Sequence, residues 1–133
     1  MTMHAHGPFD VKLAPLDPAH TGEGALGRMS IDKQFRGDLV ATSEGEMLSI
    51  MTAVAGSGAY VALERVTGTL NGRSGTFVLQ HSATMTRGTP HLSLTVVPDS
   101  GTGALAGLAG SMEIIIDAGK HSYDFDYTLG ESP

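Results

Sequence analysis

The feature that most constrains the fold of this chain is an alternation of apolar and polar side chains with a period of two residues. It is clearest near the end of the chain, where His121, Tyr123, Phe125 and Tyr127 alternate with serine and aspartate. This period predicts half-buried β-strands, because an amphipathic helix repeats every 3.6 residues. Similar runs, each ended by glycine, proline, asparagine or aspartate, lie near residues 9–13, 29–31, 47–54, 60–69, 76–82, 92–97 and 112–117. The sequence therefore predicts about eight strands and little helix.

Two short turn sequences connect neighbouring runs. Asn71-Gly72 predicts a two-residue hairpin, because both residues tolerate the positive φ of a type I′ turn, and 118–120 predicts a second hairpin. The segment 104–109 is interrupted by Gly107, which favours a turn or one 3₁₀ segment over a helix. Regularly spaced short strands indicate an all-β sandwich or barrel, and an antiparallel barrel is favoured because closure removes exposed edges.

Length and composition limit the organisation of the chain and its partners. The 133 residues suit one domain, and we expect a flexible N-terminus over 1–7, one barrel domain over 8–130 and a tail over 131–133. With 41% hydrophobic and 17% charged residues, the chain can bury a core. A net charge of −6 disfavours nucleic acid as a partner. The absence of cysteine excludes thiolate metal sites and cysteine nucleophiles.

The sequence shows no pattern typical of a membrane helix, a secretory signal or a cofactor site. The longest apolar runs fall far short of the roughly 20 residues of a membrane helix, and the first residues lack the pattern of a secretory signal. We therefore expect a cytoplasmic protein that does not bind membranes. His4 and His6 lie two positions apart, but a zinc site needs at least a third ligand, so we predict no metal site and no cofactor.

A glycine-rich stretch and several other segments carry a resemblance to known families. Residues 98–110 resemble a glycine loop of allene oxide cyclase and dirigent-type barrels, and Gly110 lacks the following Lys-Ser/Thr of a phosphate-binding loop. Residues 35–39, 60–65, 68–81 and 119–123 resemble a bacterial family known as domain of unknown function number 3224. This resemblance spans about residues 8–130. It implies an eight-stranded, allene oxide cyclase-like (calycin-like) barrel with a central cavity, and it implies no established reaction.

The strand parity identifies candidate residues inside the barrel. His81 shares a face with Phe77 and Leu79, and His121 shares a face with Tyr123 and Tyr127, so these side chains are expected to point inward. Ser122, Asp124 and Asp126 should then be exposed. We predict a ligand-binding set made of Tyr60, Phe77, Leu79, His121, Tyr123 and Tyr127. The alternative for each histidine is a structural residue with a satisfied hydrogen bond.

Glu64 and His81 are the candidate catalytic pair. The hairpin at Asn71-Gly72 places position 64 opposite 79 and position 62 opposite 81, so Glu64 is diagonal to His81. Both faces of the strand at 60–69 are mixed, and Glu64 points inward only if Arg65 is solvated; a surface glutamate is the alternative. A buried carboxylate beside an imidazole could move one proton, although a structural hydrogen bond is the other interpretation.

These observations indicate a small-molecule-binding barrel with an apolar cavity. The alternative function is a cofactor-independent cyclase or isomerase of an apolar metabolite, with Glu64 and His81 as the acid–base pair. A packed barrel that acts through an interaction surface is a third interpretation. The run at 47–54 is apolar on both faces, which favours a homo-oligomer.

Overall fold

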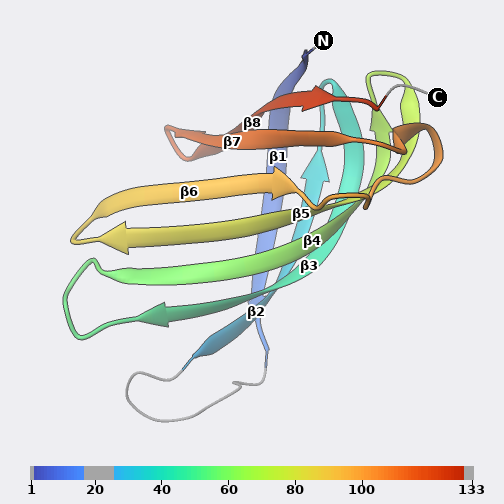
Figure 1. Ribbon diagram of the computed structural model, residues 1–133. Helices are drawn as coiled ribbons and strands as arrows, with labels where there is room; N and C mark the ends of the chain where they lie inside the picture. Colours follow the sequence, from blue (N-terminus) through green and yellow to red (C-terminus); the bar gives the residue numbers. More distant parts are fainter. Residues whose placement is uncertain (1, 17–25, 131–133) are drawn as a thin grey trace.

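The computed structural model describes residues 2–16 and 26–130, and these form a closed barrel of eight antiparallel strands (Figure 1). Each strand pairs with its neighbours in the sequence, and β1 pairs with β8 to close the barrel. In the described part of the chain the one helical element is a single 3₁₀ turn, which overlaps the start of the segment 104–109 predicted for it, and the predicted all-β barrel is confirmed. The elements are β1 (Met3–Pro15), β2 (Gly27–Phe35), β3 (Leu39–Met51), β4 (Gly58–Leu70), β5 (Arg73–Thr86), β6 (Thr89–Val96), η1 (Gly103–Leu105), β7 (Ala109–Asp117) and β8 (Lys120–Thr128).

The predicted hairpins set the register of the strands. Asn71 and Gly72 have φ values of 46° and 85°, and Ala118 and Gly119 form the second turn with positive φ. Because the first turn has two residues, Glu64 lies opposite Leu79 and position 62 lies opposite 81, as predicted. This register brings the two candidate catalytic residues onto one face of the sheet.

Two strands begin earlier than the sequence pattern suggested. The first begins at Met3, inside the segment 1–7 predicted to lie apart from the barrel domain, and residues 3–9 pair with residues 121–127 of β8. The run predicted at 47–54 belongs to a strand that begins at Leu39 and ends at Met51. The first half of this strand was not predicted, because its inner face carries the small or polar residues Ala41, Ser43 and Gly45. A half-buried strand is normally recognised by large apolar residues at these alternate positions. The predicted tail at 131–133 lies outside the described residues.

One end of the barrel is packed with aromatic and aliphatic side chains. The Tyr123 hydroxyl donates a hydrogen bond to the Arg36 carbonyl at 2.6 Å and accepts one from the Leu39 amide at 2.8 Å, which ties β8 to the β2–β3 turn. Leu105 and Leu108, from the loop between β6 and β7, cover the interior. The buried residues of this core include Phe9, Phe35, Leu39, Val66, Leu70, Phe77, Leu79, Leu94, Met112, Tyr123, Phe125 and Tyr127.

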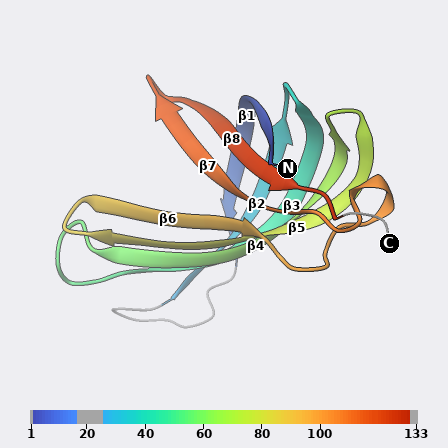
Figure 2. The same ribbon diagram turned by 45° about the horizontal axis from the view of Figure 1, so that its top comes forward.

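The other end of the barrel is open. The hairpins β3–β4 and β5–β6 extend together on one side, while the β7–β8 hairpin diverges from them (Figure 2). The register between β6 and β7 contains one pair, Thr95 with Ser111, whereas β5 and β6 share eight. Consequently the inner faces of the diverging strands lose their facing neighbours toward this end. No helix in the described part of the chain is long and apolar enough to cross a membrane.

Candidate functional site

A cluster of four buried polar side chains lies on the inner face of the barrel. Lys33, Ser43, Glu64 and His81 come from β2, β3, β4 and β5, and they are the buried polar or charged residues of the described part of the chain. The strand register brings them together, because Lys33 lies opposite Ser43 and Glu64 lies diagonal to His81. We call these four residues the polar cluster.

Gly45 makes room for the carboxylate of the cluster. It lies directly opposite Glu64 in the β3–β4 ladder. A Cβ atom at position 45 would lie 2.2 Å from the Leu63 carbonyl oxygen and 2.8 Å from the Glu64 Cβ. The close approach of the two backbones therefore requires glycine here, independently of its freedom in φ.

Glu64 is an ionised carboxylate held by three donors. Its Oε1 accepts hydrogen bonds from Lys33 Nζ at 2.8 Å and from His81 Nε2 at 2.6 Å, and its Oε2 accepts one from Ser43 Oγ at 2.6 Å. Burial acts to raise its pKa, but the His81 hydrogen bond, the Lys33 charge and the hydrogen bonds from Lys33 and Ser43 together lower the pKa to about 2. The carboxylate is therefore charged at neutral pH although its side chain is fully buried.

Lys33 is enclosed as tightly as the carboxylate that it neutralises. Its Nζ lies 5.2 Å from the ring centre of Phe9 and 5.7 Å from that of Phe35. The ammonium group thus contacts one carboxylate and two aromatic rings, and its side chain is buried. Because the charges of Lys33 and Glu64 cancel, the pair adds no net charge to the barrel interior.

His81 connects the ion pair to a half-buried tyrosine. The Tyr60 hydroxyl lies 3.1 Å from His81 Nδ1, on the side of the imidazole away from Glu64. Burial, followed by the negative charge of Glu64, raises the pKa of Tyr60, so the phenol keeps its proton at neutral pH. Lys33, Glu64, His81 and Tyr60 therefore form one continuous chain of hydrogen bonds, which leads from the core toward the open end.

Four other residues of the predicted ligand set lie in the packed core. Phe77, Leu79 and Tyr123 point inward as predicted, and they are part of the packed core. Tyr127 is also buried, and its hydroxyl accepts a hydrogen bond from Asn71 Nδ2 at 2.7 Å at the closed end. None of these four side chains contacts the polar cluster through a hydrogen bond described in the structure.

The strand parity predicts that His121 points inward and that Ser122, Asp124 and Asp126 on β8 point outward. His121 is half-buried, with its ring 5.4 Å from that of Phe9, and it pairs with Ile116 next to the β7–β8 turn, so it lies nearer the open end than the core tyrosines. Asp124 and Asp126 are exposed as predicted, while Ser122 is half-buried. The parity prediction for β8 is therefore confirmed for the side-chain directions, with Ser122 more covered than expected.

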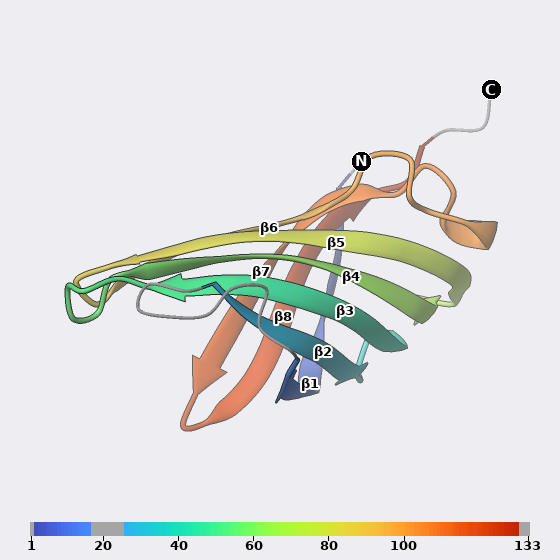
Figure 3. The same ribbon diagram turned by 90° about the horizontal axis from the view of Figure 1, so that it is seen from below.

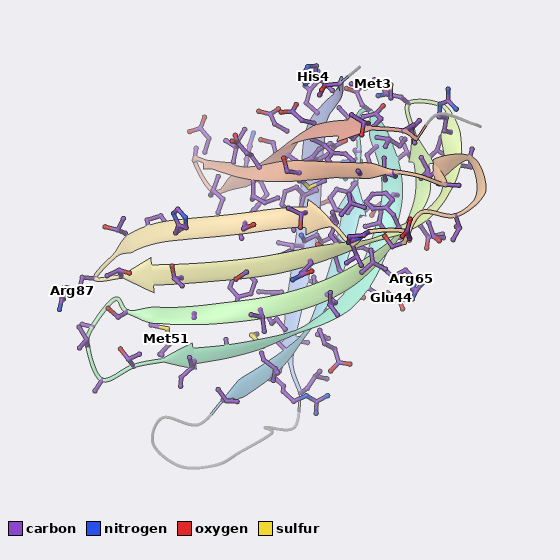
Figure 4. All side chains as sticks on the ribbon, viewed as in Figure 1. Met3, His4, Glu44, Met51, Arg65 and Arg87 are labelled. Carbon is purple, nitrogen blue, oxygen red and sulfur yellow. The ribbon has the colours of Figure 1, made fainter. Side chains whose placement is uncertain are left out.

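The inner face at the open end carries exposed apolar side chains. Met51 and Ile116 are each 65% exposed although their strand positions face inward. Figure 4 shows Met51 at the end of β3, beside the turn that leads into β4. We call this set of residues the apolar mouth: Leu13, Met51, Met85, Leu92 and Ile116. Tyr60 lies between the polar cluster and this mouth along β4.

One surface hollow of the described residues lies outside the barrel, and not in the central cavity that the resemblance implies. It is an open groove of about 1410 Å³ over the outer faces of β2–β5. These four strands lie side by side in Figure 3. Outward side chains such as Leu48, Val61 and Leu63 line it, and Glu44 and Arg65, side by side in Figure 4, lie on the same face. Inside the barrel, the aromatic side chains of the core pack against one another at the closed end.

Sequence reasoning missed Lys33 and Ser43 of the polar cluster, and Leu13, Leu92 and Ile116 of the apolar mouth. A signal for Lys33 was present, because it shares the parity of Ile31 and Phe35, which are both buried. Near the N-terminus, His4 contacts Asp126, and His6 lies 3.8 Å from Asp38. Within the described residues, no group of three histidine or carboxylate side chains could hold a metal ion.

The fold and the polar cluster define an antiparallel β-barrel with an internal ion pair and a tyrosine–histidine relay. The family model described as a protein of unknown function, DUF3224, matches residues 5–127. The chain belongs to the DUF3224 family. A crystal structure of a DUF3224 protein of unknown function from Shewanella oneidensis MR-1 is 51% identical in sequence and has a TM-score of 0.95. That similarity covers 99% of this chain and 100% of the other, and no curated protein matches this chain.

Proposed function

We propose that this protein binds a small apolar molecule at the apolar mouth, with a polar group of the ligand at Tyr60. The observation that carries this proposal is the chain from Lys33 through Glu64 and His81 to Tyr60, which ends beside exposed apolar side chains. Binding sites for small molecules combine an apolar lining with a few placed polar groups. The methionines of the mouth support this function further, because a thioether side chain adapts to ligands of different shape.

A neutral fluorescent probe can locate such a site. We expect N-phenyl-1-naphthylamine to gain fluorescence on binding, and Leu92→Asp in the mouth to weaken its binding at least fivefold. Val61→Asp is the matched control, because Val61 is also exposed but lies on the outer face. A loss of binding in Val61→Asp instead would place the site in the outer groove and contradict the proposal. Native mass spectrometry of freshly purified protein then shows whether a metabolite is retained.

The second candidate function is a cofactor-independent isomerase or cyclase, the activity class associated with allene oxide cyclase-like barrels. The observation that favours it is the relay itself, because His81 can act on a ligand through Tyr60. The Tyr60 oxygen would take a proton from the ligand while the Tyr60 proton passes to His81 Nδ1, and the carboxylate of Glu64 would stabilise the resulting imidazolium. Return of the proton to a different ligand atom would complete an isomerisation.

In this mechanism Glu64 is a positioning residue and Tyr60 is the group that touches the ligand. The three donors around Glu64 leave it no free access to a ligand. For a ligand identified by mass spectrometry, we expect Glu64→Gln and His81→Gln to abolish incorporation of solvent deuterium, while Glu44→Gln leaves it unchanged. Full exchange in both cluster variants would leave the protein as a carrier.

A further inference from the structure

The proton positions in the relay follow from the ionisation of Glu64. An ionised carboxylate can only accept hydrogen bonds, so the His81 Nε2 that lies 2.6 Å from Glu64 Oε1 must carry a hydrogen. A neutral imidazole with its hydrogen on Nε2 has a lone pair on Nδ1. With His81 neutral, the hydrogen bond of 3.1 Å between His81 Nδ1 and the Tyr60 hydroxyl is donated by the phenol.

This assignment determines what Tyr60 can offer to a ligand. The phenol has one hydrogen, which is committed to His81, and its oxygen retains lone pairs. Tyr60 is half-buried, whereas His81 and Glu64 are buried, so the Tyr60 oxygen is the outermost polar atom of the relay. A ligand that approaches from the apolar mouth therefore meets a hydrogen-bond acceptor.

The charges near Tyr60 disfavour an anionic ligand. Lys33 is the one cation of the polar cluster, and its ammonium group is enclosed by Glu64, Phe9 and Phe35. The five side chains that define the apolar mouth cannot solvate a carboxylate or phosphate. Tyr60 would also present oxygen lone pairs to such a group, with the negative charge of Glu64 behind it.

We propose that the ligand is a neutral apolar molecule that carries a hydroxyl group, and that this hydroxyl donates a hydrogen bond to the Tyr60 oxygen. The inference rests on the proposed binding function and narrows it to a chemical class. It excludes fatty acids and phosphorylated metabolites, and it favours alcohols over ethers and hydrocarbons of the same size.

Three probes of nearly equal size test this preference: 2-naphthalenemethanol, its methyl ether, and 2-naphthoate. The chain has no tryptophan, so naphthalene fluorescence can be followed with little background from the protein. At pH 8.5 we expect the alcohol to bind about 3- to 10-fold more tightly than the ether. Naphthoate should bind at least tenfold more weakly than the alcohol.

Variants at Tyr60 separate this inference from the binding function. Tyr60→Phe should reduce the affinity for the alcohol to that for the ether and leave the affinity for the ether unchanged. Tyr127→Phe is the matched control, because it removes a tyrosine hydroxyl at the closed end of the barrel and should preserve the preference for the alcohol. Equal affinities for alcohol and ether, or tightest binding of naphthoate, would overturn the hydroxyl proposal while the binding function stands. If none of the three probes binds, both proposals are wrong.

Discussion

Glu64→Gln should destabilise the protein by removing the charge that neutralises a buried lysine. The substitution keeps the size of the side chain, so the packing around it is preserved. It leaves the Lys33 ammonium inside the barrel beside a neutral amide, with only the rings of Phe9 and Phe35 as other near neighbours described for it. Removing one partner of a buried ion pair typically costs about 3–5 kcal/mol.

The pKa of Glu64 gives an independent value for the free energy that this carboxylate contributes to folding. It falls from the ordinary value of 4.5 to about 2 in the folded protein. Each tenfold change in proton affinity corresponds to about 1.4 kcal/mol, so the carboxylate contributes about 3 kcal/mol to folding at neutral pH. Because the folded-state pKa is the lower one, this contribution is complete above about pH 5 and is lost as the pH falls from there toward 2.

Urea unfolding followed by circular dichroism at pH 7 and at pH 3 measures both effects. At pH 7 we expect Glu64→Gln to lower the free energy of unfolding by about 3 kcal/mol, and the exposed control Glu44→Gln to change it by less than about 0.5 kcal/mol. The parent should lose more stability between pH 7 and pH 3 than Glu64→Gln does. A loss below about 1 kcal/mol at pH 7, together with identical pH dependence, would refute the reasoning.

Three further substitutions test the fold around the site. Gly72→Val should cost about 1 kcal/mol or more in unfolding free energy, because φ is 85° there although no atom lies within 4 Å of the added Cβ; an unchanged melting temperature would contradict the turn. Tyr123→Phe should cost about 1–3 kcal/mol, since it leaves a buried amide without its acceptor, and a loss below that range in urea unfolding would contradict the role of the hydroxyl. Gly45→Ala should lower the melting temperature by pushing the backbone at Glu64 away, whereas Gly27→Ala, whose added Cβ meets a serine hydroxyl at 3.3 Å, should be tolerated; equal effects would exclude the close approach at Gly45.

The barrel and part of its register could be predicted because local signals were strong. Asn71-Gly72 defines the β4–β5 turn, and a two-residue turn fixes every pair in the two strands that it joins. The aromatic alternation from Tyr123 to Tyr127 identifies the inner face of β8 without knowledge of its partners. Both signals depend on residues adjacent in the sequence, which is why one sequence was sufficient.

The orientation of Glu64 could not be derived in the same way. Its strand has apolar residues on both faces, because Val61 and Leu63 line the outer groove while Ala62 and Val66 face the core. Parity cannot distinguish the faces of such a strand. Two of the partners of Glu64, Lys33 and Ser43, come from β2 and β3, and the turns that join these strands to each other and to β4 carry no short hairpin signal that fixes their register, so the full cluster was visible only in three dimensions.

Burying the charges of Lys33 and Glu64 costs desolvation free energy. A variant that removes both charges can therefore separate the role of the polar cluster in stability from its role in ligand binding. Replacing both members of a buried ion pair with apolar residues is often neutral or stabilising, whereas removing one is not. We therefore expect Lys33→Met combined with Glu64→Leu to unfold within about 2 kcal/mol of the parent and to be more stable than Glu64→Leu alone. The same double variant no longer fixes the hydrogen on His81 Nε2, so it should lose the preference of Tyr60 for an alcohol over its methyl ether. A double variant that is as unstable as the single one would show that the ion pair is needed for folding. A stable one that keeps the preference would show that Glu64 does not orient the relay.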